Sequence, residues 1–263
     1  MISSAKNEQI KRVIELQKKA RARNEAGLFL VEGIRMIAEL PAERTEKLYV
    51  SEGFLNGLSD ADAEKLPASV PREVVTDSVF SAMSDTRTPQ GVLAVVRQYD
   101  HSLEEILSQK GPALLMILEN IQDPGNLGTI IRAGEGAGIT GVIMSRDTVD
   151  IYNPKVIRST MGSVFRVPFC YEEDLFGAVR TVKESGVRLL AAHLNGTACY
   201  DEERLAGDVG FLIGNEGNGL TDGLTALADG LVKIPMAGRV ESLNAAVAAS
   251  ILMFETARQR RGA

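Results

Sequence analysis

The chain of 263 residues has little of what builds disulfide scaffolds or metal sites: two cysteines, two histidines and no tryptophan. Cys170 and Cys199 cannot form a disulfide framework, and they show no paired spacing typical of metal ligands. His193 ends an apolar run, which favours a structural role for this histidine. We therefore expect no metal in the protein, and the sequence offers no Ser-His-Asp arrangement.

No apolar run approaches the roughly 18 residues that a membrane-spanning helix needs. The first 23 residues carry charges throughout and lack the apolar core of a secretory signal. Hydrophobic residues make up 44% of the chain and charged residues 24%, which is typical of globular proteins and excludes a disordered or collagen-like chain. We expect a cytoplasmic protein of one or two domains, without a membrane span.

The net charge is −6, yet residues 1–23 carry seven Lys and Arg against two Glu, a local charge of 7 − 2 = +5. An acidic total argues against nucleic-acid binding over the whole surface, whereas a local basic stripe can still contact phosphate. This segment alone favours a simpler interpretation, a solvated amphipathic helix that packs on Ile10, Val13, Ile14 and Leu16.

Strand and helix patterns divide the chain into two units. In residues 1–98, strands are expected at 27–33, 46–52 and 92–98, and helices at 34–40 and around 53–66. Residues 99–112 are polar, end in Gly-Pro and are expected to form a linker. These features predict a small α/β unit followed by a second domain.

The second unit, residues 113–263, is richer in buried strands. Apolar runs of strand length lie at 113–120, 141–145, 188–194, 209–215 and 230–236. Such runs, separated by helices, predict a largely parallel sheet that is covered on both faces. Ligands of such sheets lie at the carboxyl ends of the strands, where three polar, Gly-rich segments occur.

The first of these segments is ENIQDPGNLG (119–128), followed by a helix that carries Arg132. Pro124 and Gly125 bend the chain after a strand, and the helix is expected to begin near Asn126. Its N-terminus offers free N–H groups, and Arg132 lies one and a half turns further on, where it can flank an anion. The simpler alternative is that Asp123 or Asn126 caps the helix and Arg132 is a surface charge.

GEGAG (134–138) raises the alternative of a dinucleotide-binding loop. It follows a helix instead of opening one, so we interpret it as a Gly-rich helix end that leads into the next strand. The chain contains no GxxxxGK[ST] sequence, which excludes a P-loop.

The second segment, FLIGNEGNGL (211–220), has three glycines within six residues after a buried strand. This spacing predicts backbone conformations that a Cβ forbids, or close approach of a ligand. Glu216 has no cation beside it in the sequence. Considered alone, Glu216 is an exposed turn residue or a cap for a helix that begins near Thr221.

The third segment, IPMAGRVESLN (234–244), precedes the apolar run AAVAASILMFE. Ser242 and Asn244 occupy positions at the N-terminus of the expected helix, and capping explains one of them. Capping does not explain the whole Gly-Arg-x-x-Ser-x-Asn cluster next to a strand end. We therefore take this segment as a third element of a candidate site.

Together, the segments NIQDPGNLGTIIRAGEGAG, FLIGNEGNGL and IPMAGRVESLNAAVAASILMFE resemble the three ordered motifs of the SpoU, or TrmH-like, RNA 2′-O-ribose methyltransferases of the SPOUT class. The resemblance covers residues 113–258. Upstream, LFLVEGIRMIAEL is similar to the family's substrate-binding domain, which has a fold like that of ribosomal protein L30e. Within the family, the chain looks most like the ribosomal RNA guanosine 2′-O-methyltransferases.

The resemblance implies an α/β protein with an N-terminal L30e-like RNA-binding domain and a C-terminal domain whose parallel sheet is tied in a trefoil knot. It implies S-adenosylmethionine as cofactor, RNA as substrate, and a homodimer whose active site is completed across the interface. By motif position, the expected cofactor contacts are Gly214, Ile234 and Leu243. The expected catalytic and substrate-binding residues are Asn126, Arg132, Glu216, Ser242 and Asn244. The candidate phosphate contacts of the N-terminal unit are Lys6, Arg12, Lys18, Lys19, Arg21 and Arg23.

Methyl transfer from a sulfonium to a hydroxyl is an in-line displacement, so the protein must supply alignment, a dry pocket and help in removing the hydroxyl proton. Arg132 is the family's candidate activator of the ribose hydroxyl. A guanidinium with a pKa above about 12 is a poor base, so its alternative role is to grip a neighbouring phosphate and stabilise the developing alkoxide. Asn126, Ser242 and Asn244 then orient the ribose and Arg132, while Glu216 orders a loop or a donor.

The sequence thus favours S-adenosylmethionine-dependent 2′-O-methylation of structured RNA, with ribosomal RNA ahead of a transfer-RNA target. One alternative is an RNA-binding or ribosome-assembly module that has kept the fold without turnover, and the intact motif residues count against it. Another is an unrelated nucleotide-binding α/β protein that uses GEGAG.

Overall fold

The computed structural model describes residues 1–196 and 198–262, and it divides into two compact units. The first unit comprises Met1–Tyr99 and Asp150–Phe165, and the second comprises Asp100–Val149 and Arg166–Ala263. Residues 150–165, which the sequence suggests are part of the C-terminal domain, therefore pack with the N-terminal residues. Aromatic packing accounts for this, since the Tyr152 ring lies 4.6 Å from the Phe29 ring.

The first unit contains a four-stranded mixed sheet in the order β1-β4-β2-β3. Strand β4 pairs antiparallel with β1 and β2, and β2 pairs parallel with β3. The strands are β1 (Leu28–Glu32), β2 (Thr45–Ser51), β3 (Arg72–Val75) and β4 (Val92–Arg97). The α-helices are α1 (Glu8–Lys18), α2 (Ala20–Ala26), α3 (Ile34–Ile37), α4 (Glu52–Asn56), α5 (Asp60–Ala63), α6 (Asp77–Met83) and α9 (Pro154–Thr160), and the 3-10 helices are η1 (Ala42–Arg44) and η2 (Ser163–Phe165).

Strands β1 and β4 of the first unit are buried almost throughout, which explains their continuous apolar sequences. Leu28 and Leu30 of β1 pack in one core with residues of α1 and α6, while Phe29 between them contacts Tyr152. The strands expected at 27–33, 46–52 and 92–98 are confirmed. The stretch expected to be helical around 53–66 contains two short helices instead of one.

The second unit is built on a seven-stranded sheet in the order β7-β6-β5-β10-β8-β11-β9. All its described pairings are parallel, as the apolar runs predict. The strands are β5 (Leu114–Leu118), β6 (Gly141–Ser145), β7 (Phe169–Glu172), β8 (Arg188–Ala192), β9 (Ala198–Cys199), β10 (Val209–Ile213) and β11 (Gly230–Lys233). The helices are α7 (Leu103–Leu107), α8 (Pro124–Ala137), α10 (Leu175–Glu184), α11 (Asp222–Thr225) and α12 (Ala245–Arg261).

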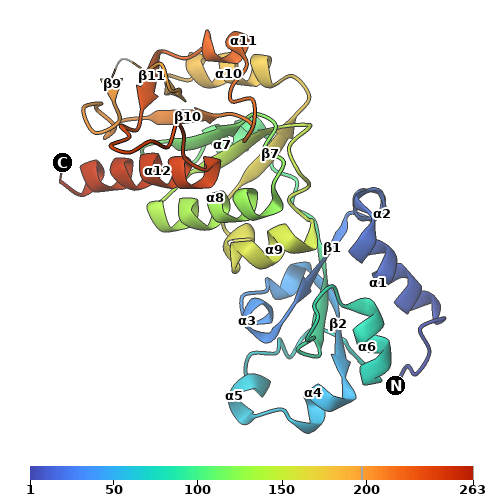
Figure 1. Ribbon diagram of the computed structural model, residues 1–263. Coiled ribbons are helices and arrows are strands. Elements are labelled where there is room, and N and C mark those ends of the chain that lie inside the picture. Colours follow the sequence, from blue (N-terminus) through green and yellow to red (C-terminus); the bar gives the residue numbers. More distant parts are fainter. Residues whose placement is uncertain (197, 263) are drawn as a thin grey trace. The chain divides into compact units, whose positions relative to one another are not determined.

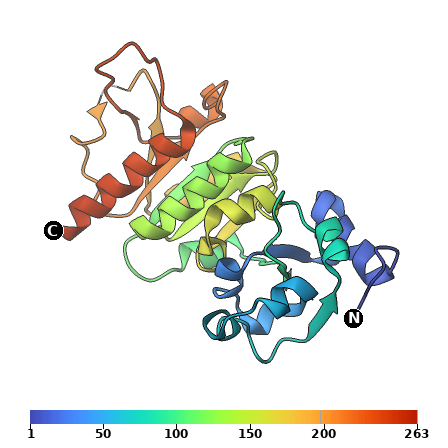
Figure 2. The same ribbon diagram turned by 60° about the horizontal axis from the view of Figure 1, so that its bottom comes forward.

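Helices cover both faces of this sheet (Figure 1). One core joins Leu115 and Ile117 of β5 to α7, α10 and α11. Helices α8 and α12 lie side by side on the opposite face (Figure 2). The expectation of a parallel sheet between two helical layers is confirmed, because residues on both sides of β5 are fully buried.

Cys170 and Cys199 are both free thiols, and burial together with the nearby Glu172 carboxylate raises the pKa of Cys170 to about 12. Within residues 1–196 and 198–262, no helix is both long and apolar enough to cross a membrane. The same residues contain no group of three or more His, Cys, Asp or Glu that could hold a metal ion.

Candidate active site

The first polar segment follows β5 and opens α8. Asp123 is the N-cap, since its side chain accepts a hydrogen bond from the Asn126 N–H, and Pro124 takes the first helical position. The helix thus starts two residues before the expected Asn126. At its other end, Gly138 closes α8 in the left-handed conformation, with φ 82°, so the interpretation of GEGAG as a helix end is confirmed.

The second polar segment is a tight loop after β10. A Cβ on Gly214 would lie 2.1 Å from the backbone carbon of Gly219, so only glycine fits at this position. The Asn215 side chain folds the loop by accepting hydrogen bonds from the N–H groups of Gly217 and Asn218. Thr221 caps the short helix α11, which is the helix expected near this residue.

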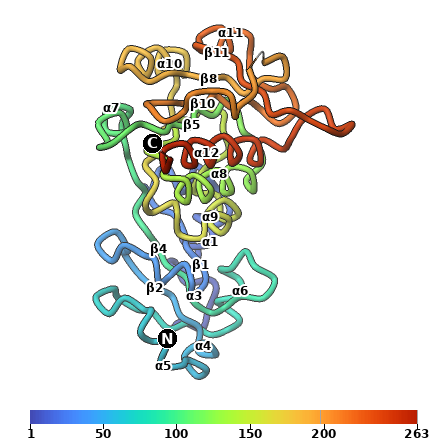
Figure 3. Tube along the Cα trace, turned by 90° about the vertical axis from the view of Figure 1, so that its left-hand side faces the viewer, coloured from blue at the N-terminus to red at the C-terminus, as the bar shows by residue number. Residues whose placement is uncertain are grey.

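The third segment runs from the end of β11 to α12 and forms the extended loop before that helix (Figure 3). Asn244 is the N-cap of α12, because its side-chain oxygen accepts hydrogen bonds from the N–H groups of Ala246 and Val247. Ser242 lies in the loop and is exposed. Capping therefore explains Asn244 and leaves Ser242 for another role.

Hydrogen bonds tie the three segments together through Asn126. This side chain is 9% exposed; its amide nitrogen donates to Glu216 Oε1 over 2.9 Å, and its oxygen accepts from Asn244 Nδ2 over 2.8 Å. With both of its polar atoms engaged, the Asn126 side chain has one orientation. Residues from three separate loops thus form a single Glu216–Asn126–Asn244 chain.

Glu216 is exposed in the second loop, but its carboxylate is fully engaged with the first. Besides Asn126, it accepts hydrogen bonds from the N–H groups of Gln122 and Asp123, each over 3.1 Å. Burial raises the pKa of Glu216, but the hydrogen bonds from Asn126, Gln122 and Asp123 outweigh it and leave the pKa below its ordinary value. The carboxylate is therefore ionised at neutral pH, and it holds the N-terminus of α8 in place.

A cavity of about 720 Å³ lies at the carboxyl ends of β8, β10 and β11. All three expected cofactor contacts, Gly214, Ile234 and Leu243, line it, and so do Glu216 and Ser242. The volume is within the range of small-molecule sites. Because Gly214 has no side chain, the backbone of Gly219 and Leu220 can pack directly against it in the cavity wall. These features fit a cofactor of the size of S-adenosylmethionine.

Arg132 is exposed on α8 and does not line this cavity. It makes no hydrogen bond or ion pair with any residue in the described parts of the chain. The second unit therefore presents Arg132 as a free cation on the helix whose first turn is held by Glu216. The roles of Arg132 and of the other motif residues in the reaction stay predictions.

The basic residues at the N-terminus differ in their exposure and in their ion pairs. Lys6, Arg12 and Lys18 are exposed, whereas Lys19 and Arg21 are exposed in ion pairs with Glu15 and Glu25. Arg23 is 3% exposed; it donates to the Asp150 carboxylate and to the Leu16 carbonyl oxygen. The expectation that Arg23 contacts phosphate is wrong, because this guanidinium is buried and paired within the first unit.

Sequence reasoning missed several residues that support these loops. The Glu119 carboxylate at the end of β5 accepts hydrogen bonds from the N–H and the hydroxyl of Thr221, over 2.7 and 2.8 Å. Asn120 has φ 56°, and its carbonyl accepts from Asn215 Nδ2. His193, expected to be only structural, lines the cavity. The one available signal was that Glu119 and Asn120 directly follow a buried strand.

A parallel α/β domain with a cavity at its strand ends and three interlocked loops defines a protein that binds a small-molecule cofactor. The model of the SpoU rRNA methylase family matches residues 113–254, and that of the MRM3-like substrate binding domain matches residues 7–94. The chain belongs to the SpoU rRNA methylase family.

Similar proteins match almost the whole chain. It is 33% identical over 257 residues to the 23S rRNA (guanosine(2553)-2′-O)-methyltransferase RlmP of Bacillus subtilis (strain 168), covering 96% of this chain and 97% of the relative. The AdoMet-bound rRNA methyltransferase from Sinorhizobium meliloti superposes with a TM-score of 0.84 at 32% identity, covering 98% and 97% of the two chains. The SpoU methyltransferase AviRb from Streptomyces viridochromogenes, in complex with AdoMet, gives 0.87 at 28% identity, covering 97% and 99%.

Proposed function

We propose that this protein transfers a methyl group from S-adenosylmethionine to the 2′-hydroxyl of a ribose in 23S-type ribosomal RNA. One observation carries the proposal: the cavity lined by Gly214, Ile234 and Leu243 adjoins the Glu216–Asn126–Asn244 chain. Relatives that match nearly the full length include 23S rRNA 2′-O-methyltransferases, and two similar structures contain AdoMet. Ribosomal RNA is therefore favoured over transfer RNA as the substrate.

The cavity residues hold the cofactor mainly by shape and backbone. Gly214 and Leu243 bring the second and third loops against it, and Ile234 supplies apolar wall at the end of β11. When bound, S-adenosylmethionine supplies an activated methyl group on a sulfonium. The cavity wall would limit the directions from which a hydroxyl can approach this group.

The motif residues orient the ribose and stabilise the charge that develops on its 2′-oxygen, and the hydroxyl proton leaves to solvent. Arg132 grips a phosphate beside the target ribose and stabilises negative charge as it develops on the 2′-oxygen, because a guanidinium does not readily accept a proton. Ser242 contacts the ribose from the third loop. Asn126 and Asn244 set the position of the first turn of α8 against that loop, and Glu216 holds Asn126 in the required orientation.

The proposal includes assembly as a homodimer, a trefoil knot in the second unit and a cytoplasmic location. Val247 and Phe254 on α12 are each 46% exposed, which supports an interface on this helix. The knot rests on the motif resemblance and on the fact that residues of the second and third loops line one cavity. Light scattering of the purified protein tests the dimer, and a monomer that methylates RNA contradicts it.

The test of the activity is transfer of radiolabelled methyl from S-adenosylmethionine to 23S rRNA that lacks its natural modifications. Mapping of methylated riboses in cells with and without the protein then identifies the nucleotide. Label in transfer RNA alone indicates the transfer-RNA alternative. Cofactor binding without transfer to any cellular RNA indicates the silent RNA-binding module and overturns the proposal.

A further inference from the structure

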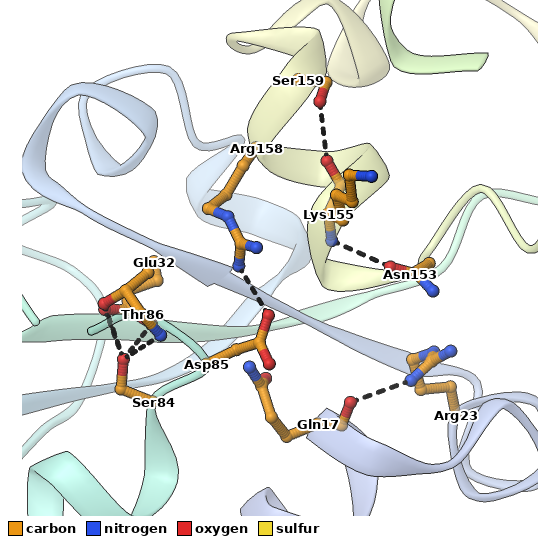
Figure 4. A network of polar contacts seen from close by, with 10 residues as sticks. All are labelled: Gln17, Arg23, Glu32, Ser84, Asp85, Thr86, Asn153, Lys155, Arg158 and Ser159. Carbon is orange, nitrogen blue, oxygen red and sulfur yellow. Dashed lines mark hydrogen bonds and ion pairs between the residues drawn. The ribbon is translucent and has the colours of Figure 1, made fainter. Parts of the chain in front are cut away.

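A loop of the first unit, residues 84–90 between α6 and β4, is anchored by several side chains and carries an arginine that has no partner among the described residues. The Glu32 carboxylate at the end of β1 accepts hydrogen bonds from the Ser84 and Thr86 hydroxyls, over 2.8 and 2.9 Å. Arg158 of α9 pairs with Asp85 over 3.0 Å. Figure 4 shows these side chains converging on the start of the loop.

The end of the loop is anchored as well. Gln90 Oε1 accepts a hydrogen bond from the Ile34 N–H over 3.0 Å, which joins the loop to the segment after β1. Gly91 has φ 85°, and a Cβ there would meet the Phe54 side chain at 2.6 Å. Its carbonyl accepts from the Ser51 N–H. The loop is therefore held at both ends by contacts to β1, β2 and α9.

Two arginines lie in the segments that the hydrogen bond between Gln90 and Ile34 joins. Arg87 lies in the middle of the loop and Arg35 directly follows Ile34; both are exposed. Neither forms a hydrogen bond or an ion pair with the parts of the chain that the structure describes. The neighbouring acids are already engaged, Glu32 by the two hydroxyls and Asp85 by Arg158, so the charges of Arg35 and Arg87 are not neutralised locally.

We propose that the 84–90 loop, with Arg87 and the adjacent Arg35, is a phosphate-contacting surface that docks the RNA substrate; this rests on the proposed function. The loop differs from an unanchored surface turn, because Ser84 and Thr86 are half-buried and hydrogen-bonded to Glu32, while Arg87 is exposed. None of the exposed large hydrophobic residues in the described chain lies in it. On a chain with net charge −6, RNA must be attracted by such local cations.

The anchored loop differs from the basic N-terminal segment in what it offers an RNA. Lys19, between α1 and α2, and Arg21 on α2 already have carboxylate partners, whereas Arg87 has none within the described residues. Anchoring at both ends keeps the loop in one conformation, so RNA binding does not need to order it. We expect Arg87 to define where RNA lies on the first unit, in addition to any free lysine of the N-terminal segment.

The experiment measures binding of the full-length protein to an unmodified 23S rRNA transcript over a series of salt concentrations. Arg87→Ala is expected to raise the Kd about five- to tenfold and to lower the magnitude of the salt slope by about 1, as for loss of one phosphate contact. The matched control is Arg180→Ala, which removes another exposed arginine without a partner, on α10. The control is expected to stay within about twofold of the wild type.

A second variant tests the anchoring instead of the charge. Ser84→Ala combined with Thr86→Ala leaves the net charge unchanged and removes the hydroxyls bound by Glu32. We expect an increase in Kd of about threefold, with S-adenosylmethionine binding and the thermal unfolding midpoint of the second unit unchanged. Wild-type RNA affinity in Arg87→Ala, or an equal loss in Arg180→Ala, overturns the inference.

Failure of the inference can be told apart from failure of the proposed function. Wild-type protein that binds S-adenosylmethionine and 23S rRNA but transfers no methyl contradicts the proposed function, and the Arg87 comparison remains decisive for the loop. Wild-type protein that methylates 23S rRNA, with Arg87→Ala unchanged in KM and Kd, contradicts the loop alone.

Discussion

The two units hold their important side chains in opposite ways. In the second unit, Asn126 is hydrogen-bonded to Glu216, 90 residues further along the chain, and to Asn244, 118 residues further along. In the first unit, Arg87 lies in an anchored loop and has no partner in residues 1–196 and 198–262. A reacting centre needs groups in fixed positions, whereas phosphate recognition needs a charge that remains free until the partner arrives. The comparison separates side chains that are held in place by neighbouring loops from cations such as Arg87 and Arg132, which have no partner in the described parts of the chain.

The largest expected effect comes from Arg132, an exposed motif cation that has no partner in the described parts of the chain. Arg132→Ala is expected to lower kcat for RNA methylation about 10²–10³-fold, because charge on the 2′-oxygen loses its stabilising group. S-adenosylmethionine affinity, measured by calorimetry, is expected to stay the same, since Arg132 does not line the cavity. Arg180→Ala serves as the control. Normal turnover by Arg132→Ala contradicts the role proposed for this residue.

The next effect concerns the buried cation of the first unit. Arg23→Ala leaves Asp150 without its partner and is expected to reduce the free energy of unfolding of this unit by about 3 kcal/mol. Hydrogen exchange of the β1 amides measures the change. Lys18→Ala, at an exposed residue on α1, is expected to change it by less than about 0.5 kcal/mol. Equal protection in the two variants means that Arg23 is not a structural anchor.

A smaller effect tests how tightly the second loop is built. Gly214→Ala places a Cβ against the backbone of Gly219, so it is expected to reduce the free energy of unfolding by about 1–3 kcal/mol and to weaken cofactor binding. Urea denaturation with and without S-adenosylmethionine measures both. The control is Gly207→Ala, where no atom lies within 4 Å of the added Cβ. Wild-type stability and affinity in Gly214→Ala disprove the tight fit.

The smallest effect is a pH dependence that belongs to Glu216. Its pKa is lower in the folded protein than in the unfolded chain, so its contribution to stability is complete above the unfolded value of about 4.3. The contribution is lost as the pH falls through the lower folded pKa. With Glu216 exposed, we expect about 1 kcal/mol at most. Unfolding of wild type and Glu216→Gln between pH 7 and pH 3 should converge at low pH; a constant difference contradicts this cause.

Much of the fold follows from local pattern. The five apolar runs after residue 112 became β5, β6, β8, β10 and β11, because a strand buried on both faces must be apolar throughout. β7 and β9 were missed because they are only four and two residues long and form the two edges of the sheet, so neither has a long apolar run. The assignment of residues 150–165 to the first unit depends on contacts such as Phe29 with Tyr152, which have no local signature.

The sequence indicated some of the residues that line the cavity, but not the hydrogen bonds that connect the loops. Motif spacing points to Gly214, Ile234 and Leu243, and all three line one cavity. No pattern along the chain indicates that Glu216 would accept hydrogen bonds from residues more than 90 positions earlier. The same limit explains Arg23: in the sequence it continues a basic run, and only the folded unit pairs it with Asp150.

The sequence by itself determined the two α/β units, the parallel sheet and the residue types of the three loops, since hydrophobic periodicity, glycines and caps act over a few neighbouring residues. The tertiary structure decided which charges are free and which are neutralised. Arg23 is buried while Arg87 and Arg132 are exposed without partners, because hydrogen bonding and burial depend on residues that are distant along the chain and meet only in the fold.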